Sequence, residues 1–448
     1  MAGTNVASQF SADIVAFIAE ETLPLARRQL IAYQFGDPLT LPKGRGTTYT
    51  ATRYNRIPLP YAPLSEGVPP IGQTMTISQV SAVAQQWGDK VTITDVAEMT
   101  IYHPLFKQAT FLVGLQVAET LERNTFNALM AGTQVNYVNS RGARSSLVAG
   151  DVLDTTTVIR TNAALETLGA PRFMGDEQTD TKVAADSGGA RASSNPRAMP
   201  HYAALIHTLV VADFRQNATV VTAWSYSDLN RLYNYEAGEW SGIRFCKSNM
   251  VPSFTGVTAI QGTAQVGGGS FTSGTWYIQV TGSDTQNQYE SQIYGVDSGH
   301  TVGLNGSITV ALPSTAGYTW NVYVGSTSSP ANLGLCALGP TVGPLQGQAT
   351  QLAGNQTVTI TGVGVAQTPP AAPGNGITVY PTFVIGRGAY GQVVLDNVKF
   401  TYLKEADKSD VLNQLRIIGW KCYYGTILLN QQFFARIESV SAYSTTFG

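Results

Sequence analysis

The sequence of 448 residues contains little charge and almost no excess of either sign. Charged residues make up 12% of the chain, about half the share of an average soluble domain, and 27 Lys and Arg face 29 Asp and Glu. A protein that neutralises many phosphates needs a basic excess, so sequence-specific binding of nucleic acid is not expected. A near-neutral surface repels its own copies only weakly, which favours self-association.

Residue types that build metal, redox and disulfide sites are also scarce. The three cysteines lie far apart and show no paired spacing: Cys246, Cys336 and Cys422. The four histidines share no metal-ligand spacing: His103, His201, His207 and His300. We therefore expect buried free thiols, no disulfide framework, no metal site and no cofactor.

One pattern looks catalytic. Residues 386–391 (GRGAYG) match the glycine pattern of dinucleotide-binding loops. Such a loop must be followed by a helix that holds the pyrophosphate, whereas Gln392–Leu395 has the composition of a strand. The pattern is interpreted as a glycine-rich turn between strands. Because no serine-hydrolase, phosphate-loop or zinc-protease motif occurs elsewhere, the chain is not expected to be an enzyme.

A long apolar run is missing as well. No stretch of about 18 apolar residues occurs, and Met1–Phe10 lacks the basic and apolar regions of a secretory signal. We expect no membrane association and a protein that is made in the cytosol.

Three segments predict helices. Residues 11–35 form an amphipathic arm, residues 104–130 give the strongest helical pattern, and residues 154–168 form a second helix between the cap Asp154 and Gly169. Apolar side chains recur along the longest of them at spacings of three and four residues: Leu105, Leu112, Leu115, Ala118, Leu121 and Leu129.

Residues 49–86 form a proline-rich segment between the first two helices. Closely spaced prolines exclude a helix and a central strand, so this segment is predicted to be extended. A long extended segment inside a compact domain usually reaches a partner. Further on, residues 175–199 read as an exposed polar loop, and strands are expected at 202–211 and 242–247 with a short helix at 227–235.

The sharpest boundary is compositional, because no Lys or Arg occurs between Lys247 and Arg387. The span contains seven short strand-like runs: 257–264, 275–281, 289–296, 307–312, 318–324, 333–338 and 357–361. They predict a β-sandwich similar to fibronectin-type or immunoglobulin-like modules, with Tyr277, Tyr318, Trp320 and Tyr323 as core candidates. The earlier composition resumes after a linker at 367–376. We interpret the sandwich as an insertion into a surface loop.

Strands are expected after the linker, around 377–385, 392–398, 417–428 and 433–440. Several short sequence motifs occur in an order that is typical of one protein family. They are 201–207 (HYAALIH) with 212–214 (ADF), 242–250 (GIRFCKSNM), 382–391 (TFVIGRGAYG), 409–414 (SDVLNQ) and 419–421 (GWK). In this order they resemble tailed-bacteriophage major capsid proteins of the Hong Kong 97 type, most closely the N-four-like capsid proteins. Val411 stands where that family often has Pro.

The resemblance implies an α+β fold with named parts. They would be an N-terminal arm (1–48), an extended E-loop (49–96), a peripheral domain with a long spine helix and an axial domain (97–254), the inserted sandwich (255–376) and closing strands (377–448). It also implies hexamers and pentamers that form an icosahedral head around double-stranded DNA, without sequence-specific binding. Portal, scaffolding and decoration or cement proteins would be further partners. The location would be the virion, assembled in the host cytoplasm.

Inter-subunit contacts are predicted for the E-loop: Arg53, Arg56, Ile57, Leu59, Tyr61, Leu64, Glu66 and Ile71. The segment cannot bury its own apolar side chains, and its charged residues would orient a partner more than add affinity.

Two other kinds of protein fit the sequence less well. A tail-fibre or adhesin protein with a carbohydrate-binding β-module would be repetitive and β-rich throughout, unlike the helical residues 104–169. A cytosolic enzyme with an appended sandwich would need a catalytic pocket that no motif indicates.

Overall fold

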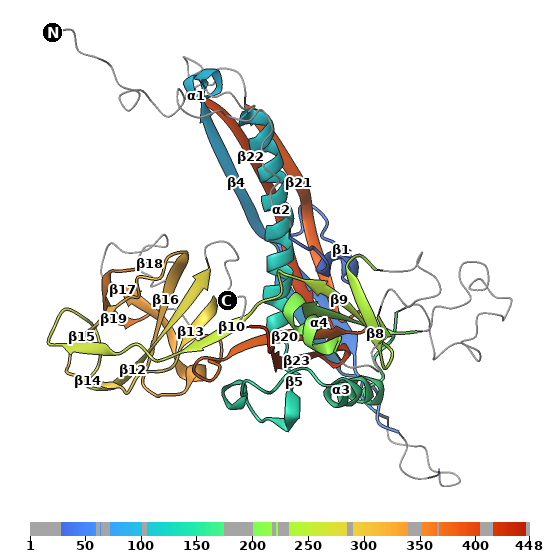
Figure 1. Ribbon diagram of the computed structural model, residues 1–448. Helices are drawn as coiled ribbons and strands as arrows, with labels where there is room; N and C mark the ends of the chain where they lie inside the picture. The colour runs from blue at the N-terminus through green and yellow to red at the C-terminus, as the bar shows by residue number, and fades with distance from the viewer. Residues whose placement is uncertain are drawn as a thin grey trace.

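The protein has a body, a long arm that projects from the body, and a β-rich module beside it in the computed structural model (Figure 1). The structure describes residues 28–59, 63, 72–100, 105–173, 200–216, 221–222, 233–284, 290–338, 352–364, 367–403 and 415–444. The predicted polar loop at 175–199 therefore lies outside the described residues.

The arm is a long sheet with a helix along one face (Figure 1). Strand β22 (Leu415–Leu428) lies between β4 (Gln85–Thr94) and β21 (Tyr390–Leu403), antiparallel to both. Strand β1 (Asp37–Thr40) pairs in parallel with the first residues of β21. Helix α1 (Asp95–Thr100) lies at the tip.

Helix α2 (Leu105–Met130) confirms the long helix predicted at 104–130. Ala109, Val113 and Val117 are buried against the sheet, at a spacing of four residues. Leu112 was expected on the apolar face but is 49% exposed. Neighbouring helical side chains point about 100° apart, so a position next to the buried row faces away from the sheet.

The body is built on a mixed sheet in the order β5-β23-β20-β6-β9-β8-β7. Its strands are β5 (Val135–Tyr137), β6 (Tyr202–His207), β7 (Val221–Thr222), β8 (Glu236–Trp240), β9 (Ile243–Ser248), β20 (Thr378–Ile385) and β23 (Phe434–Val440). Helices α3 (Thr155–Thr167) and α4 (Thr208–Phe214) cover one face; residues 31–35 and the end of α2 cover the other. Because both faces are covered, the four central strands are almost wholly buried.

One helix cap was predicted from the sequence and is confirmed, whereas a second cap was not predicted. The amide of Thr157 donates to the Asp154 side chain at 3.1 Å, and Gly169 ends the helix with φ +69°, as predicted. The strand expected at 202–211 is wrong from residue 208 onward, where α4 begins. His207 causes the change, because its Nδ1 accepts from the amide of Leu209 at 3.2 Å and caps the helix.

Two further helical predictions concern residues that are described only in part. The helix expected at 11–35 is wrong at its end, since residues 32–34 form a single 3₁₀ turn. Of the short helix expected at 227–235, only residues 233–235 are described, and they form a turn. The 3₁₀ turns of the described chain are Ala32–Gln34, Val138–Ser140, Arg144–Ser146, Pro330–Asn332 and Gln431–Phe433.

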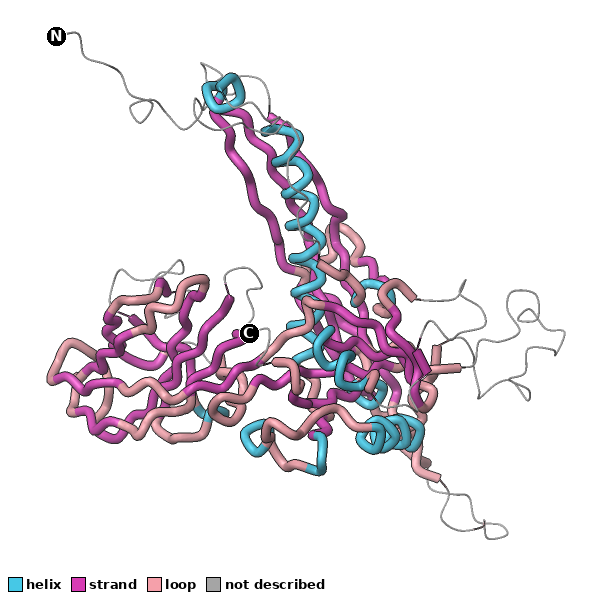
Figure 2. The backbone as a smooth tube through the Cα atoms, in the orientation of Figure 1, coloured by secondary structure: helices cyan, strands magenta, loops and turns pink. Residues whose placement is uncertain are grey.

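The regular secondary structure of the module is mainly strand, with loops between the strands (Figure 2). They are β11 (Gly262–Gln265), β12 (Gly274–Asp284), β13 (Glu290–Tyr294), β14 (His300–Val302), β15 (Ser307–Ala311), β16 (Tyr318–Gly325), β17 (Gly334–Leu338), β18 (Leu352–Ala353) and β19 (Thr357–Val363). One layer pairs β11, β15, β19 and β17, the other β13, β12, β16 and β18. Their shared core contains Trp320, as predicted, whereas Tyr323 is buried on the opposite face of its sheet.

Strand β10 (Phe254–Val257) joins the module to the body. It pairs antiparallel with β20 of the body through Phe254 and Thr255, and in parallel with β13 of the module through Thr255 to Val257. The run expected at 257–264 is therefore two strands, β10 and β11, with different partners. The module is therefore joined to the body by sheet hydrogen bonds as well as by the covalent chain.

Two local predictions are confirmed in the described chain. Cys246, Cys336 and Cys422 are buried. Residues 386–389 form a turn between β20 and β21, with Gly388 at φ +73°, and residues 390–391 begin β21.

Candidate inter-subunit surface

Part of the segment predicted to be the E-loop forms a two-stranded hairpin that belongs to neither large sheet. Strands β2 (Thr48–Tyr54) and β3 (Ile77–Val83) pair antiparallel from Thr48 opposite Val83 to Tyr54 opposite Ile77. Strand β4, which the sequence placed in the same segment, pairs with β22 and belongs to the arm. An isolated two-stranded ribbon is marginally stable in water and gains from contact with another surface.

The base of the hairpin is packed on its own chain. Tyr49 and Ala82 contact a small core that contains Val393 and Ile427. The amide of Ala84 donates to the carbonyl of Thr47 at 2.8 Å and closes the base. The direction of the hairpin is thus fixed where it leaves the arm.

Beyond the base, apolar side chains are exposed. Leu59 is 88% and Tyr54 68% exposed, so most of each side chain is open to solvent. Ile57, Met75, Ile77 and Val80 are between 38% and 66% exposed. Val83, at the base, is 53% exposed. So many exposed apolar groups on one projection are typical of a protein-binding surface.

The predicted contact residues have different surroundings. Arg56, Ile57 and Leu59 are exposed beyond β2, as an inter-subunit role requires. The guanidinium of Arg53 instead donates to the Asn430 side chain of the same chain. The other four, Tyr61, Leu64, Glu66 and Ile71, lie outside the described residues, and the roles of all eight stay predictions.

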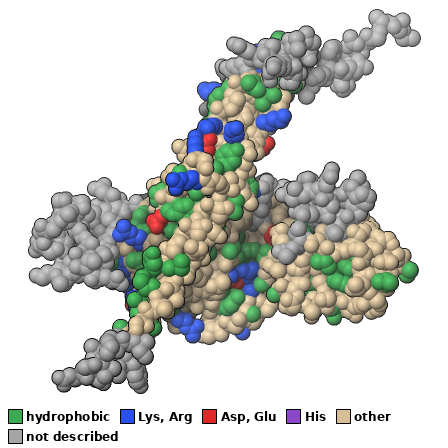
Figure 3. Space-filling view, turned by 180° about the vertical axis from the view of Figure 1, so that it is seen from behind, with side chains coloured by type: hydrophobic (Ala, Val, Ile, Leu, Met, Phe, Trp, Pro, Cys, Tyr) green, Lys and Arg blue, Asp and Glu red, His purple; other side chains and the backbone are tan. Residues whose placement is uncertain are grey.

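Sequence reasoning missed a second apolar surface near the tip of the arm. Phe400, Tyr402, Leu403, Leu415 and Met99 are each more than a third exposed. The space-filling view shows hydrophobic side chains along the arm, with Lys and Arg among them (Figure 3). The alternation of Lys399, Phe400, Thr401 and Tyr402 was the available signal, but alternation alone does not tell which face is covered.

The basic side chains of the arm include a like-charged pair. Lys399 and Lys421 lie directly opposite each other on β21 and β22, an arrangement that is unfavourable unless an anion is near. Asp396 supplies one, with ion pairs to Lys399 at 2.5 Å and Lys43 at 3.4 Å. Hydrogen bonding from Lys399 is the main reason that the pKa of Asp396 is below its usual range.

The start of the described chain is pinned to the body and α2. The Glu122 carboxylate on α2 accepts hydrogen bonds from the amides of Ile31 and Ala32, both at 2.7 Å. Tyr390 donates to the carbonyl of Ala32, and Ser248 to that of Gln29. Burial raises the pKa of Glu122, although the backbone donors oppose the shift. Residues 29–32 are therefore held against the body and α2.

The described part of the chain has no group of three or more His, Cys, Asp and Glu side chains that could hold a metal ion. Among its helices, none is long and apolar enough to cross a membrane.

Comparison with solved structures then identifies the architecture. No protein-family model and no curated protein matches the sequence. The capsid of Ralstonia phage GP4 is similar over 98% of both chains, with a TM-score of 0.50 and 8% identity. The chain has the Hong Kong 97-type capsid fold. Capsid structures of cyanophage P-SCSP1u (12% identity, 97% of this chain and 94% of that chain) and cyanophage Pam1 (10%, 99% and 100%) give a TM-score of 0.47 each.

The capsid fold confirms the predicted α+β class and the predicted order of elements: extended segment, long helix, mixed region and late strands. At 8% identity, the likeness concerns the fold alone. The boundaries of the predicted domains and the immunoglobulin-like character of the module stay predictions.

Proposed function

We propose that this chain is a major capsid protein that assembles into the icosahedral head of a tailed bacteriophage. The observation that carries the proposal is the projecting β2–β3 hairpin with its exposed apolar side chains, on a chain with the capsid fold. In the shell, this hairpin is the E-loop and lies across a neighbouring subunit.

Burial supplies the physical reason for assembly. Covering a large apolar side chain contributes about 1.5–3 kcal/mol, so several hairpin residues together favour association by an amount that no surface ion pair of this chain could give. Each subunit both offers a hairpin and receives one. The exposed residues at the arm tip supply a second contact, and Arg56 and Glu66 orient the partner.

The remaining parts follow from this assignment. Residues 1–48 are the N-terminal arm, α2 is the spine helix of the peripheral domain, and the body sheet with α3 and α4 belongs to the axial domain. Residues 255–376 are an insertion. The chain is structural and catalyses no reaction.

Hexamers and pentamers of this chain enclose double-stranded DNA without reading its sequence, which agrees with the near-balanced charge. Portal, scaffolding and decoration or cement proteins complete the head, which is assembled in the host cytoplasm and forms part of the virion. A tail fibre, the alternative function, would not need a spine helix packed on a long sheet.

Sedimentation of hairpin variants tests the proposal. Ile77→Asp places a charge on the exposed face of β3 and should shift the chain from fast-sedimenting particles to capsomers or monomers. Ile77→Leu keeps the apolar group and should assemble. Val266→Asp adds the same charge at a fully exposed apolar residue of the module and should also assemble. Unchanged sedimentation of Ile77→Asp, with native circular dichroism, would contradict the proposed role of the hairpin.

A further inference from the structure

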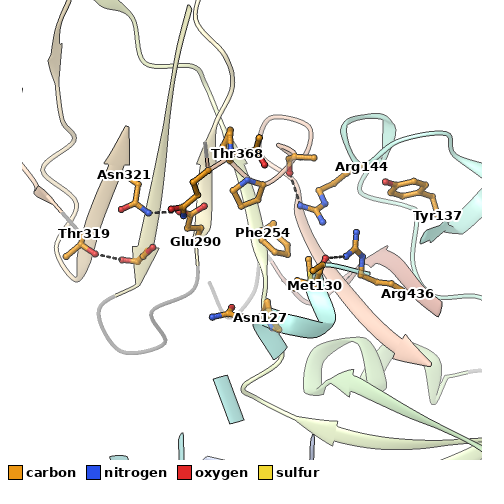
Figure 4. Close-up of a pocket in the computed structure, with 17 residues that line it drawn as sticks. Asn127, Met130, Tyr137, Arg144, Phe254, Glu290, Thr319, Asn321, Thr368 and Arg436 are labelled. Atoms are coloured by element: carbon orange, nitrogen blue, oxygen red, sulfur yellow. Dashed lines mark hydrogen bonds between the residues drawn. The ribbon is translucent and has the colours of Figure 1, made fainter. Parts of the chain in front are cut away.

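A cavity of about 900 Å³ lies where the module meets the body. The body contributes Met130, Arg144 and Arg436, and the module contributes Glu290 and Asn321 (Figure 4). Pro252, Phe254 and residues 367–371, which lead into and out of the module, complete the wall. The cavity therefore combines cationic, polar and apolar groups from segments far apart in sequence.

The body wall contains two arginines for one carboxylate. Arg144 binds Glu438 with two hydrogen bonds, of 2.7 and 2.5 Å, and Arg436 lies 3.0 Å from the same carboxylate. All three residues are at most 8% exposed. Among the described residues, one positive charge of this buried cluster is thus left without a counter-charge, and a buried charge that lacks a partner is strongly unfavourable.

The module wall does not supply the missing charge. Glu290 is the one acidic residue among those that line the described cavity, and its Oε1 accepts from Asn321 at 2.5 Å and from Tyr323 at 2.7 Å. Burial raises the pKa of Glu290 despite these donors. Within the described residues, Glu290 is hydrogen-bonded to its own sheet and forms no ion pair with Arg144 or Arg436.

Apolar groups stand beside the arginines. The Arg144 guanidinium lies 4.2 Å from the centre of the Phe254 ring and donates to the carbonyl of Ala371 at 2.8 Å. Met130 also lines the cavity, and its backbone carbonyl accepts a hydrogen bond from Arg436. A ligand with an anionic group and a short carbon chain would match this wall.

We propose that the cavity binds a small organic oxyanion, a carboxylate or a phosphate ester, whose charged group pairs with Arg436 and Arg144 and whose carbon atoms contact Phe254 and Met130. The site goes beyond the proposed function, because it needs neither a second copy nor a shell. Its ligand links the body to the module and makes the stability of their junction depend on the ligand concentration.

Calorimetric titration of the unassembled full-length chain with succinate and with inorganic phosphate, at constant ionic strength in chloride, tests the site. We expect saturable binding of at least one of them and a rise in thermal midpoint at saturation. A response to succinate alone assigns a carboxylate ligand, and a response to phosphate alone assigns a phosphate ester. No response to either probe would overturn the proposal.

Variants distinguish this site from a general salt effect. Arg436→Gln leaves the balanced Arg144 and Glu438 pair and should weaken binding by about tenfold or more, whereas Arg436→Lys keeps the charge and should bind. Arg160→Gln removes an exposed arginine of α3 and should behave as wild type. If Arg436→Gln does not fold, Ala131→Phe, which fills the cavity from its rim, should give the same loss. Full binding by Arg436→Gln or, where that variant does not fold, by Ala131→Phe would refute the assignment.

Discussion

The amide of Gly376 donates a 2.8 Å hydrogen bond to the carbonyl of Gly256, so the chain leaves and re-enters the body at one place. The two glycines are separated by the whole module. A Cβ on Gly256 would lie 2.2 Å from the carbonyl oxygen of Gly374, which explains why a residue without a side chain stands there. An inserted unit whose ends meet in this way can be removed with a short connection.

The structure places the ends of a tolerated deletion differently from the boundary predicted by composition. Replacing residues 258–375 by a short Gly/Ser linker keeps β10, whose Phe254 and Thr255 pair with β20. We expect this variant to fold and to assemble shells. Deletion of 255–376, the interval predicted from composition, removes most of β10 and should lower the thermal midpoint. Aggregation of the shorter deletion, together with an unfolded isolated module, would contradict the insertion.

Glu122 should position the root of the N-terminal arm. Glu122→Ala leaves the amides of Ile31 and Ala32 buried without an acceptor, which costs about 1–3 kcal/mol for each. Glu122→Gln keeps an acceptor and should cost much less. Because the pKa of Glu122 is raised in the folded state, wild-type stability declines as pH rises through that pKa, and the Gln variant lacks this decline. Urea unfolding at several pH values measures both effects. Equal losses of unfolding free energy in Glu122→Ala and Glu122→Gln would count against this role of Glu122.

His207 should make the body sensitive to acid. Burial lowers the pKa of His207 to about 4, from 6.5. The unfolded chain therefore binds more protons below pH 6.5, and stability is lost as pH falls from 6.5 towards 4. His207→Asn keeps a side-chain cap for Leu209 without a titrating group in this range. Its thermal midpoint should fall less steeply over that interval, and an identical slope would argue against His207 as the source.

Mature particles should lack the lysine-to-asparagine cross-links of the founding member of the fold. That reaction needs an E-loop lysine whose deprotonated amine is the nucleophile. No lysine occurs between Lys43 and Lys90, and an arginine stays protonated at ordinary pH. Boiled, reduced particles should migrate near 47.7 kDa on denaturing electrophoresis. A surviving ladder of multiples would point to Lys43 or Lys90.

Helices and strands with a periodic apolar pattern or a cap could be predicted from the sequence. Which of their surfaces are covered by other parts of the chain could not. Helix α2, helix α3 with its Asp154 cap and the closing strands have local signals that the fold keeps. The end of β6 was misread because His207 caps a helix inside an aliphatic run, where propensity alone favours a strand.

The candidate surface shows the same limit. Pro-rich spacing identified an exposed extended segment, but which of its residues contact their own chain depends on tertiary neighbours. Asn430 next to Arg53 is 377 residues away in sequence. The apolar tip of the arm and the arginine cluster at the cavity likewise join segments that no local pattern relates.

Negative-stain electron microscopy of the purified full-length chain tests the central claim, that this protein builds a shell from copies of itself. We expect closed isometric shells, or tubes and sheets of hexameric capsomers, and their loss in Ile77→Asp but not in Ile77→Leu. Fibres, or compact particles that stay monomeric at every concentration and salt condition tested, would contradict the account.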